Sequence, residues 1–243
     1  MLRFGLSGIG GIVLFLCSQP LLGQRKSAGT RPSSVSVQFV GCKLQGQLDT
    51  TDAPIGTSVS VTVNRGSAQR LAFYKTVLND GVLAPRGWYC LGIQGSSGAR
   101  LLVSPEPLDG ASHQNGPVVS ISYSAGEGSG AIIVAEIISR AFPAWKAFAD
   151  QVYNGFDLAP PSGPYPKDRL TYKSETMVEY ETPAQSEGLG TQPWVVKGGN
   201  PIDGVAILVG KAPDLVLLSV RLPGNLAKLT PEIVRQVERT YAK

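Results

Sequence analysis

Three groups of residues have types and spacings that could carry chemistry, and the first is a glycine-rich run. Gly126, Gly128 and Gly130 follow a predicted strand and precede a predicted helix. This resembles a dinucleotide-binding turn, but no parallel strand ending in an acidic residue follows it. We therefore expect a flexible strand-to-helix connection whose free N–H groups could bind a small anion, and we expect no cofactor.

The second group could support acyl transfer. Gly95-Ser96-Ser97-Gly98 is one residue short of a nucleophile elbow, and it lies between two predicted strands, whereas an elbow needs a strand-to-helix turn. His113 is the only histidine of the chain, and Asp109 lies near it in a predicted loop. Nothing in this spacing requires a Ser–His–Asp triad, so a solvated loop histidine is the simpler interpretation.

The third group consists of carboxylates. Glu179 and Glu181 are two positions apart on a predicted strand, which places both on one face. Glycosidases need two carboxylates that face each other across a cleft. A charged solvent face of an edge strand explains the same pattern without catalysis, so the sequence identifies no catalytic residue.

The run APRGWYC combines Arg86, Trp88, Tyr89 and Cys90. On a strand, Trp88 and Cys90 share one face and Tyr89 points to the other. A tryptophan beside a disulfide often fills a core, and this is the interpretation that we favour. The alternative is an exposed patch of Arg86, Trp88 and Tyr89 that binds a ligand or a partner.

The N-terminus has the features of a secretory signal peptide over residues 1–23. Arg3 precedes an apolar run, and Leu21 and Gly23 stand at the −3 and −1 positions of a cleavage before Gln24. We expect residues 24–34 to be a disordered exit segment. The alternative is an uncleaved N-terminal segment that tethers the protein to the membrane.

Cleavage would leave two cysteines, Cys42 and Cys90. An even number in an exported chain predicts one disulfide, although two buried free thiols remain an alternative. Two cysteines and one histidine do not make a closed zinc site, so no metal is expected.

Periodicity predicts a β-rich, largely antiparallel N-terminal part. Apolar and polar residues alternate along short runs bounded by turn residues, and the Gly95–Gly98 turn joins two runs as a hairpin. The predicted strands cover residues 34–40, 57–63, 69–78, 87–93, 99–105 and 116–124.

The C-terminal half mixes helices and strands. Residues 129–153 have helical periodicity that Pro143 interrupts, and Thr230 and Pro231 begin a C-terminal helix. Residues 170–183 predict one long strand, and residues 204–210 and 215–222 predict a hairpin buried on both faces.

Together these elements predict an α+β fold, in which helices pack on one face of a sheet. We expect residues 35–243 to form a single domain, with a sub-boundary conceivable in the Pro-rich loop 158–169.

The composition excludes some classes of partner. The formal net charge is +4 with 16% charged residues, and no basic cluster is interleaved with aromatic residues. This is not the pattern of a nucleic-acid-binding protein. Charges within the longest apolar runs argue against a membrane span after signal removal.

Several blocks resemble a group of uncharacterised exported bacterial proteins. They are APRGWYC, GSSG, GPYPKDRLTYKSE, ETPAQSEGLGT and PIDGVAIL. The resemblance implies a location in the envelope or outside the cell, but it implies no activity and no site.

We therefore expect a periplasmic or secreted protein without catalytic activity, which binds an unknown protein or a small molecule in the envelope. The alternative is an envelope hydrolase that uses carboxylates or a serine in loops 94–98, 109–115 and 184–193.

Overall fold

The computed structural model describes residues 33–242. The predicted signal peptide of residues 1–23 lies outside the described residues, as does the predicted exit segment up to residue 32. The described residues form one compact unit built from two β-sheets and four α-helices.

The smaller sheet has four strands in the order β4-β1-β5-β6. Strand β1 pairs antiparallel with β4 and parallel with β5, and the short helix α1 (Arg65–Ala68) links β4 to β5. The strands are β1 (Ser33–Gly41), β4 (Ser58–Val63), β5 (Leu71–Lys75) and β6 (Val82–Pro85).

The larger sheet has nine strands in the order β10-β11-β12-β13-β9-β8-β7-β2-β3. All neighbours are antiparallel except β2 and β7, which are parallel. The strands are β2 (Leu44–Gln45), β3 (Thr50–Thr51), β7 (Tyr89–Gly95), β8 (Gly98–Ser104), β9 (Val118–Ser124), β10 (Arg169–Ser174), β11 (Met177–Thr182), β12 (Ile202–Val209) and β13 (Asp214–Arg221).

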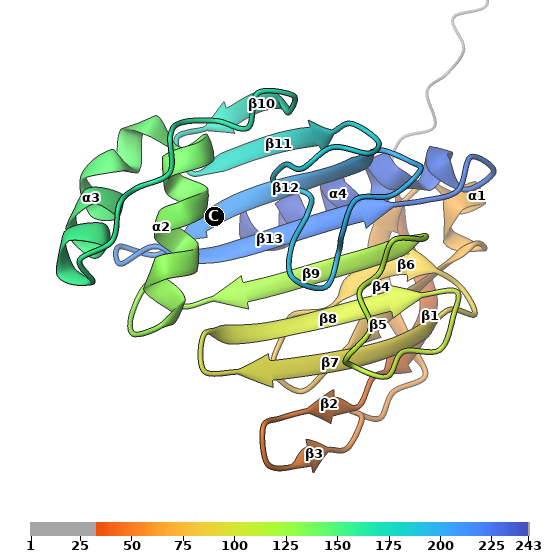
Figure 1. Cartoon of the computed structure of the whole chain (residues 1–243). Coiled ribbons are helices and arrows are strands. Elements are labelled where there is room, and N and C mark those ends of the chain that lie inside the picture. The colour runs from red at the N-terminus through yellow and green to blue at the C-terminus, as the bar shows by residue number, and fades with distance from the viewer. Residues whose placement is uncertain (1–32, 243) are drawn as a thin grey trace, which may run out of the picture. The chain divides into compact units, whose positions relative to one another are not determined.

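Both faces of the larger sheet are covered (Figure 1). Helices α2 (Gly130–Ala141) and α3 (Lys146–Gly155) lie on one face, and the smaller sheet and α4 (Thr230–Tyr241) lie on the other. Alternation along β13 explains this arrangement, because Leu215 and Leu217 pack into the core under α2 while Val216 and Leu218 pack into the core under α4.

The predicted α+β class, with its largely antiparallel strands and its C-terminal helix, is confirmed. The hairpins of β7 with β8 and of β12 with β13 are confirmed as well, and Pro143 separates α2 from α3. Helices α2 and α3 share one face of the larger sheet as expected, whereas α4 packs on the opposite face.

The single long strand that we predicted for residues 170–183 is wrong. Strands β10 and β11 form a hairpin, with Glu175 and Thr176 at its turn. The turn lacks Gly, Pro, Asn and Asp, and hydroxyl groups stabilise it instead, because the Thr176 N–H donates to Ser174 Oγ at 3.2 Å. Such a turn interrupts the alternation by too little to be read from the sequence.

The predicted disulfide between Cys42 and Cys90 is present, with a Cα–Cα distance of 5.5 Å. Cys42 follows β1 of the smaller sheet and Cys90 lies in β7 of the larger one, so the bond joins the two sheets. In the part of the chain that the structure describes, every helix is too short or too polar to span a lipid bilayer.

Candidate functional site

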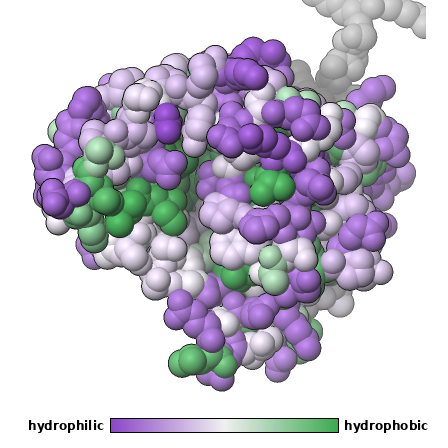
Figure 2. Space-filling model, viewed as in Figure 1, coloured by the Kyte–Doolittle hydropathy of each residue, from purple (hydrophilic) through white to green (hydrophobic). Residues whose placement is uncertain are grey.

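A cavity of about 550 Å³ lies against the face of the larger sheet that carries α2. Strands β7, β8 and β9 form one wall, Ile133 and Glu136 of α2 form another, and residues Gln192–Trp194 close a third side. Figure 2 shows a hollow in this position, between α2 and the loop that connects β11 to β12. We call this cavity the central pocket.

The three loops that we predicted a hydrolase would use all contribute residues to the central pocket. The β7–β8 turn contributes Ser97, the loop after β8 contributes Gly110, and the β11–β12 loop contributes Gln192 and Pro193. The topology brings them together, because the loops follow neighbouring strands or cross the same face of the sheet.

Arg100 of β8 is the cation of the central pocket. Its side chain donates to Ser120 Oγ at 3.2 Å, and its Cζ lies 5.5 Å from the centre of the Trp194 ring. Burial lowers the pKa of the Arg100 guanidinium to about 10, partly opposed by Tyr180, so the group stays charged at neutral pH. Within residues 33–242, no carboxylate forms an ion pair with it.

Two hydrogen bonds join Trp194 to the backbone of the loop after β8. Its Nε1–H donates to the carbonyl of Gly110 at 3.0 Å, and its own carbonyl accepts from the N–H of Gln114 at 2.8 Å. Gln114 and Val195 also form a parallel β-bridge. The ring against which Arg100 stacks is therefore held by two loops that are far apart in sequence.

Arg221, at the end of β13, forms hydrogen bonds with the backbone of both loops. The side chain is 1% exposed, and it donates to the carbonyls of Gln114 and Gly116 at 3.3 and 3.2 Å and to the carbonyl of Val196. Burial lowers the pKa of Arg221. It therefore fixes the backbone after Trp194 together with the loop that follows β8.

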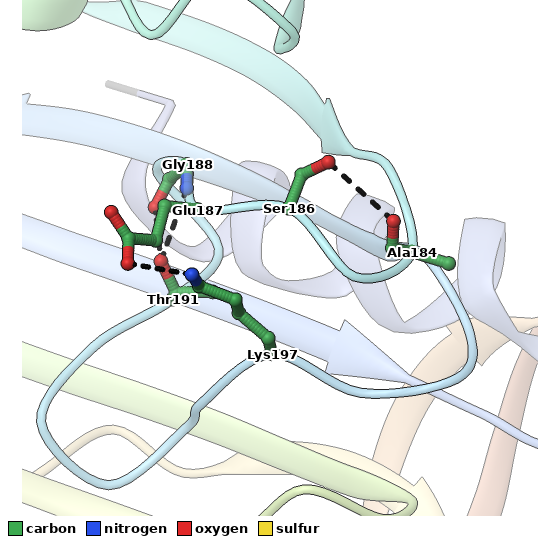
Figure 3. Close-up of polar contacts among 6 residues, drawn as sticks. All are labelled: Ala184, Ser186, Glu187, Gly188, Thr191 and Lys197. Carbon is green, nitrogen blue, oxygen red and sulfur yellow. Dashed lines mark hydrogen bonds and ion pairs between the residues drawn. The ribbon is translucent and has the colours of Figure 1, made fainter.

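The β11–β12 loop also has a structure of its own (Figure 3). Thr191 Oγ1 donates to the carbonyl of Gly188 at 2.8 Å and accepts from the Gly188 N–H at 3.1 Å. Lys197 forms an ion pair with Glu187 at 2.8 Å. These contacts hold the loop in a fixed form where it crosses the sheet.

The glycine-rich run predicted as an anion site lies at the start of α2, beside the central pocket. The N–H of Gly126 donates to Asp214 Oδ1 at 2.9 Å, and the Tyr123 hydroxyl donates to the same carboxylate. Gly128 has a left-handed backbone with φ of +57°, and Gly130 begins α2. One carboxylate of the protein thus already binds this turn, and anion binding by the glycines stays a prediction.

His113 is exposed and does not line the central pocket. The Asp109 carboxylate accepts from the N–H groups of Ala111 and Ser112 at 3.0 and 2.8 Å and from the Ser112 hydroxyl at 2.8 Å. These bonds lower the pKa of Asp109. Asp109 therefore supports its own turn, and the structure does not join it to His113.

Glu179 and Glu181 do lie on one face of β11, as expected. Lys173 pairs with Glu179 at 2.9 Å and Arg169 pairs with Glu181, both across the β10–β11 hairpin. They border a cavity of about 640 Å³ between this hairpin and α4. Charged side chains line this cavity, but Glu179 and Glu181 already have cationic partners. The central pocket, whose arginine lacks such a partner among the described residues, is therefore the better candidate for a ligand site.

The residues of the APRGWYC run divide between core and surface. Trp88 is half-buried against the core between the two sheets, and its backbone N–H donates to the Tyr74 hydroxyl at 3.1 Å. Arg86 is exposed and Tyr89 is 54% exposed. Trp88 and Cys90 thus face the core, while Arg86 and Tyr89 are accessible to a partner.

Sequence reasoning missed the main residues of the central pocket, namely Arg100, Glu136 and Trp194. Arg100 is the one charged residue in its strand, between apolar neighbours, and this was the available signal. No pattern in the neighbouring sequence indicated that Trp194 would lie against Arg100.

Comparison with protein-family models, with curated proteins and with solved structures found nothing that matches this chain. Function is therefore inferred from the geometry of the pocket.

Proposed function

We propose that the protein is an exported, non-catalytic binding protein that holds a small anionic ligand in the central pocket. The observation that supports this proposal is the Arg100 guanidinium. It has five N–H donors and gives one hydrogen bond to the protein within the described residues. Burying a cation without a counterion is costly, and a ligand carboxylate would recover that cost.

The pocket suits a ligand with an apolar body and a charged end. Ile93, Ile133 and Trp194 provide apolar surface, and the serines and glutamines around them provide a few polar contacts. This mixture is typical of small-molecule sites, in which apolar walls give affinity and a few polar groups give orientation.

A thermal-shift screen of small aryl and alkyl carboxylates, each paired with its neutral amide, tests the proposal. We expect some carboxylates to raise the melting temperature by about 5 °C or more at a hundredfold excess over Kd, while their amides do not. Arg100→Gln should abolish the shift. Arg65→Gln, which alters an exposed arginine of α1 far from the pocket lining, is the matched control. Equal shifts with acids and amides would contradict the proposal.

The hydrolase is a second candidate, because the loops that it requires do converge on the central pocket. Esters and amides of any carboxylate that binds can be incubated with the protein and followed by chromatography. Cleavage that disappears in Ser97→Ala or Glu136→Gln would favour the hydrolase over the binding protein.

Export is supported by the Cys42–Cys90 disulfide, since such bonds persist in oxidising compartments. The predicted signal peptide can be tested by N-terminal sequencing of the protein recovered from the periplasm or the medium. A mature chain beginning at Gln24 would agree with cleavage, and an intact Met1 in the membrane fraction would favour the tethered form.

A further inference from the structure

The central pocket contains an anion as well as a cation. Glu136 of α2 lines it from the helix side, whereas Arg100 lines it from the sheet side. The two side chains do not pair with each other, and among residues 33–242 neither of them forms an ion pair with any other side chain. Glu136 accepts a single long bond, from the Tyr165 hydroxyl at 3.5 Å.

Two opposite charges thus line a partly apolar cavity, and neither has an ion-pair partner among the residues that the structure describes. The cost of removing such groups from water is recovered when a ligand supplies the missing charges. A ligand with one negative and one positive group satisfies both at once. A purely anionic ligand would satisfy Arg100 and leave Glu136 as it is.

The remaining polar groups of the pocket suit amide bonds. Four glutamines line it, and each side-chain amide offers an acceptor and donors that can pair with the N–H and the C=O of a peptide group. They are Gln45, Gln47, Gln94 and Gln192. The apolar surface of Ile93, Ile133 and Trp194 lies among them and can pack against a side chain of the ligand.

The hollow also continues beyond Glu136. A second cavity of about 320 Å³ shares Glu136, Gln192 and Pro193 with the central pocket and extends towards Tyr165 and Lys197. Glu136 therefore lies at the edge of the central pocket, where the two cavities meet.

We propose that the ligand of the central pocket is a short peptide with free termini, whose carboxylate binds Arg100 and whose ammonium group binds Glu136. This inference rests on the proposed function and adds the chemical class of the ligand. The glutamines bind the peptide groups between the two ends, and the apolar walls accept the central side chain.

Isothermal titration with a set of Ala-X-Ala tripeptides, in which X covers apolar and polar residues, tests the inference on the wild-type protein. The best binder is then compared with its N-acetylated form and with its C-terminal amide. We expect each blocked form to bind at least tenfold more weakly than the free peptide. Free alanine should bind at least tenfold more weakly as well, because it has no peptide group for the glutamines to bind.

Variants assign the two ends. Glu136→Gln should weaken binding of the free peptide at least tenfold and leave binding of the N-acetylated form unchanged. Arg100→Gln should also weaken binding of the free peptide at least tenfold, and it should leave binding of the C-terminal amide unchanged. Glu175→Gln, in the exposed β10–β11 turn, and Arg65→Gln are the matched controls, and both should bind like the wild type.

Equal binding of the free and N-acetylated peptides would overturn the role of Glu136 and the zwitterionic ligand. Absence of binding by every tripeptide would overturn the inference as well. Both results are independent of whether the variants fold. The proposed function is judged separately by the screen of carboxylates and amides, so a protein that binds carboxylates but no peptide would retain the function and lose the inference.

Discussion

Two arginines on the same face of the larger sheet lack carboxylate partners among the described residues, yet their surroundings give them different roles. Arg221 is 1% exposed and donates to three backbone carbonyls. Arg100 gives one bond to a serine and faces a cavity. A guanidinium that donates to three carbonyls stabilises loops, whereas one with free donors beside a cavity is available to a ligand.

We expect Arg221→Met to destabilise the protein by about 3 kcal/mol, because it leaves three part-buried carbonyls without their donor. Urea denaturation measures the change. Arg65→Met is the control, and a change within about 0.5 kcal/mol is expected for this exposed residue. An unchanged denaturation midpoint in Arg221→Met would show that the three carbonyls find other donors.

Glu238 of α4 gives the protein a pH-dependent stability. Its Oε1 is buried and has no hydrogen-bond donor in the described part of the chain. Burial and the neighbouring Glu179 carboxyl raise the pKa of Glu238 to about 7, against the opposing effects of Lys173 and Arg235. The folded protein therefore binds this proton more tightly than the unfolded chain does, whose pKa is near the ordinary 4.5.

The contribution of Glu238 is fully present below pH 4.5 and is lost as the pH rises through 7. We expect Glu238→Gln to be more stable than the wild type by about 1 kcal/mol at pH 8, a value reduced for partial exposure, and to match it near pH 5. Urea denaturation at both pH values measures this, with Glu175→Gln as the control. A constant difference between wild type and variant at the two pH values would contradict the assignment.

At the scale of elements, the sequence predicted those features that depend on neighbouring residues. Alternation identified β9, nearly continuous apolar runs identified β12 and β13, and Pro143 marked the break between α2 and α3. The central pocket was not predictable, because it depends on the β11–β12 loop crossing the sheet until Trp194 meets Arg100. A contact between residues so far apart has no periodic signal in either segment.

Asp168 fastens that loop to the sheet. Its carboxylate accepts from Thr182 Oγ1 at 2.8 Å, at the end of β11, and from the N–H of Leu189 at 2.7 Å, within the loop. Burial raises the pKa of Asp168, while both hydrogen bonds lower it. A single side chain thus links the hairpin to the loop that carries Trp194.

We expect Asp168→Ala to cost about 2 kcal/mol and to loosen the β11–β12 loop, because two bonds that order its backbone are lost. Hydrogen exchange followed by mass spectrometry should show faster exchange across residues 184–197, while peptides from β12 and β13 keep their protection. Asp52→Ala, at an exposed position, is the control. Unchanged exchange in the loop would show that its own contacts are sufficient to hold it.

At the scale of the whole molecule, the fold joins two sheets, and the sequence predicted many of their strands and two of their hairpins but not the order of the strands. The Cys42–Cys90 bond was predictable, because these are the two cysteines that remain after the predicted signal peptide. Which sheets it connects was not, because that depends on the chain leaving the smaller sheet after β1 and adding β2 in parallel to β7. The bond therefore lies where the chain passes from one sheet to the other, and Gln45 and Gln47 of the central pocket follow directly.

Removing this cross-link tests whether it stabilises the whole fold. The bond closes a loop of 48 positions, and the loss of chain entropy in the unfolded state corresponds to about 4 kcal/mol. We expect Cys42→Ser with Cys90→Ser to lower the free energy of unfolding by about this amount, and dithiothreitol to reduce the wild type to the same value. Because the two sheets share one core, both should unfold in a single transition in either form. A variant that unfolds in two steps would show that the bond, and not the shared core, couples the two sheets.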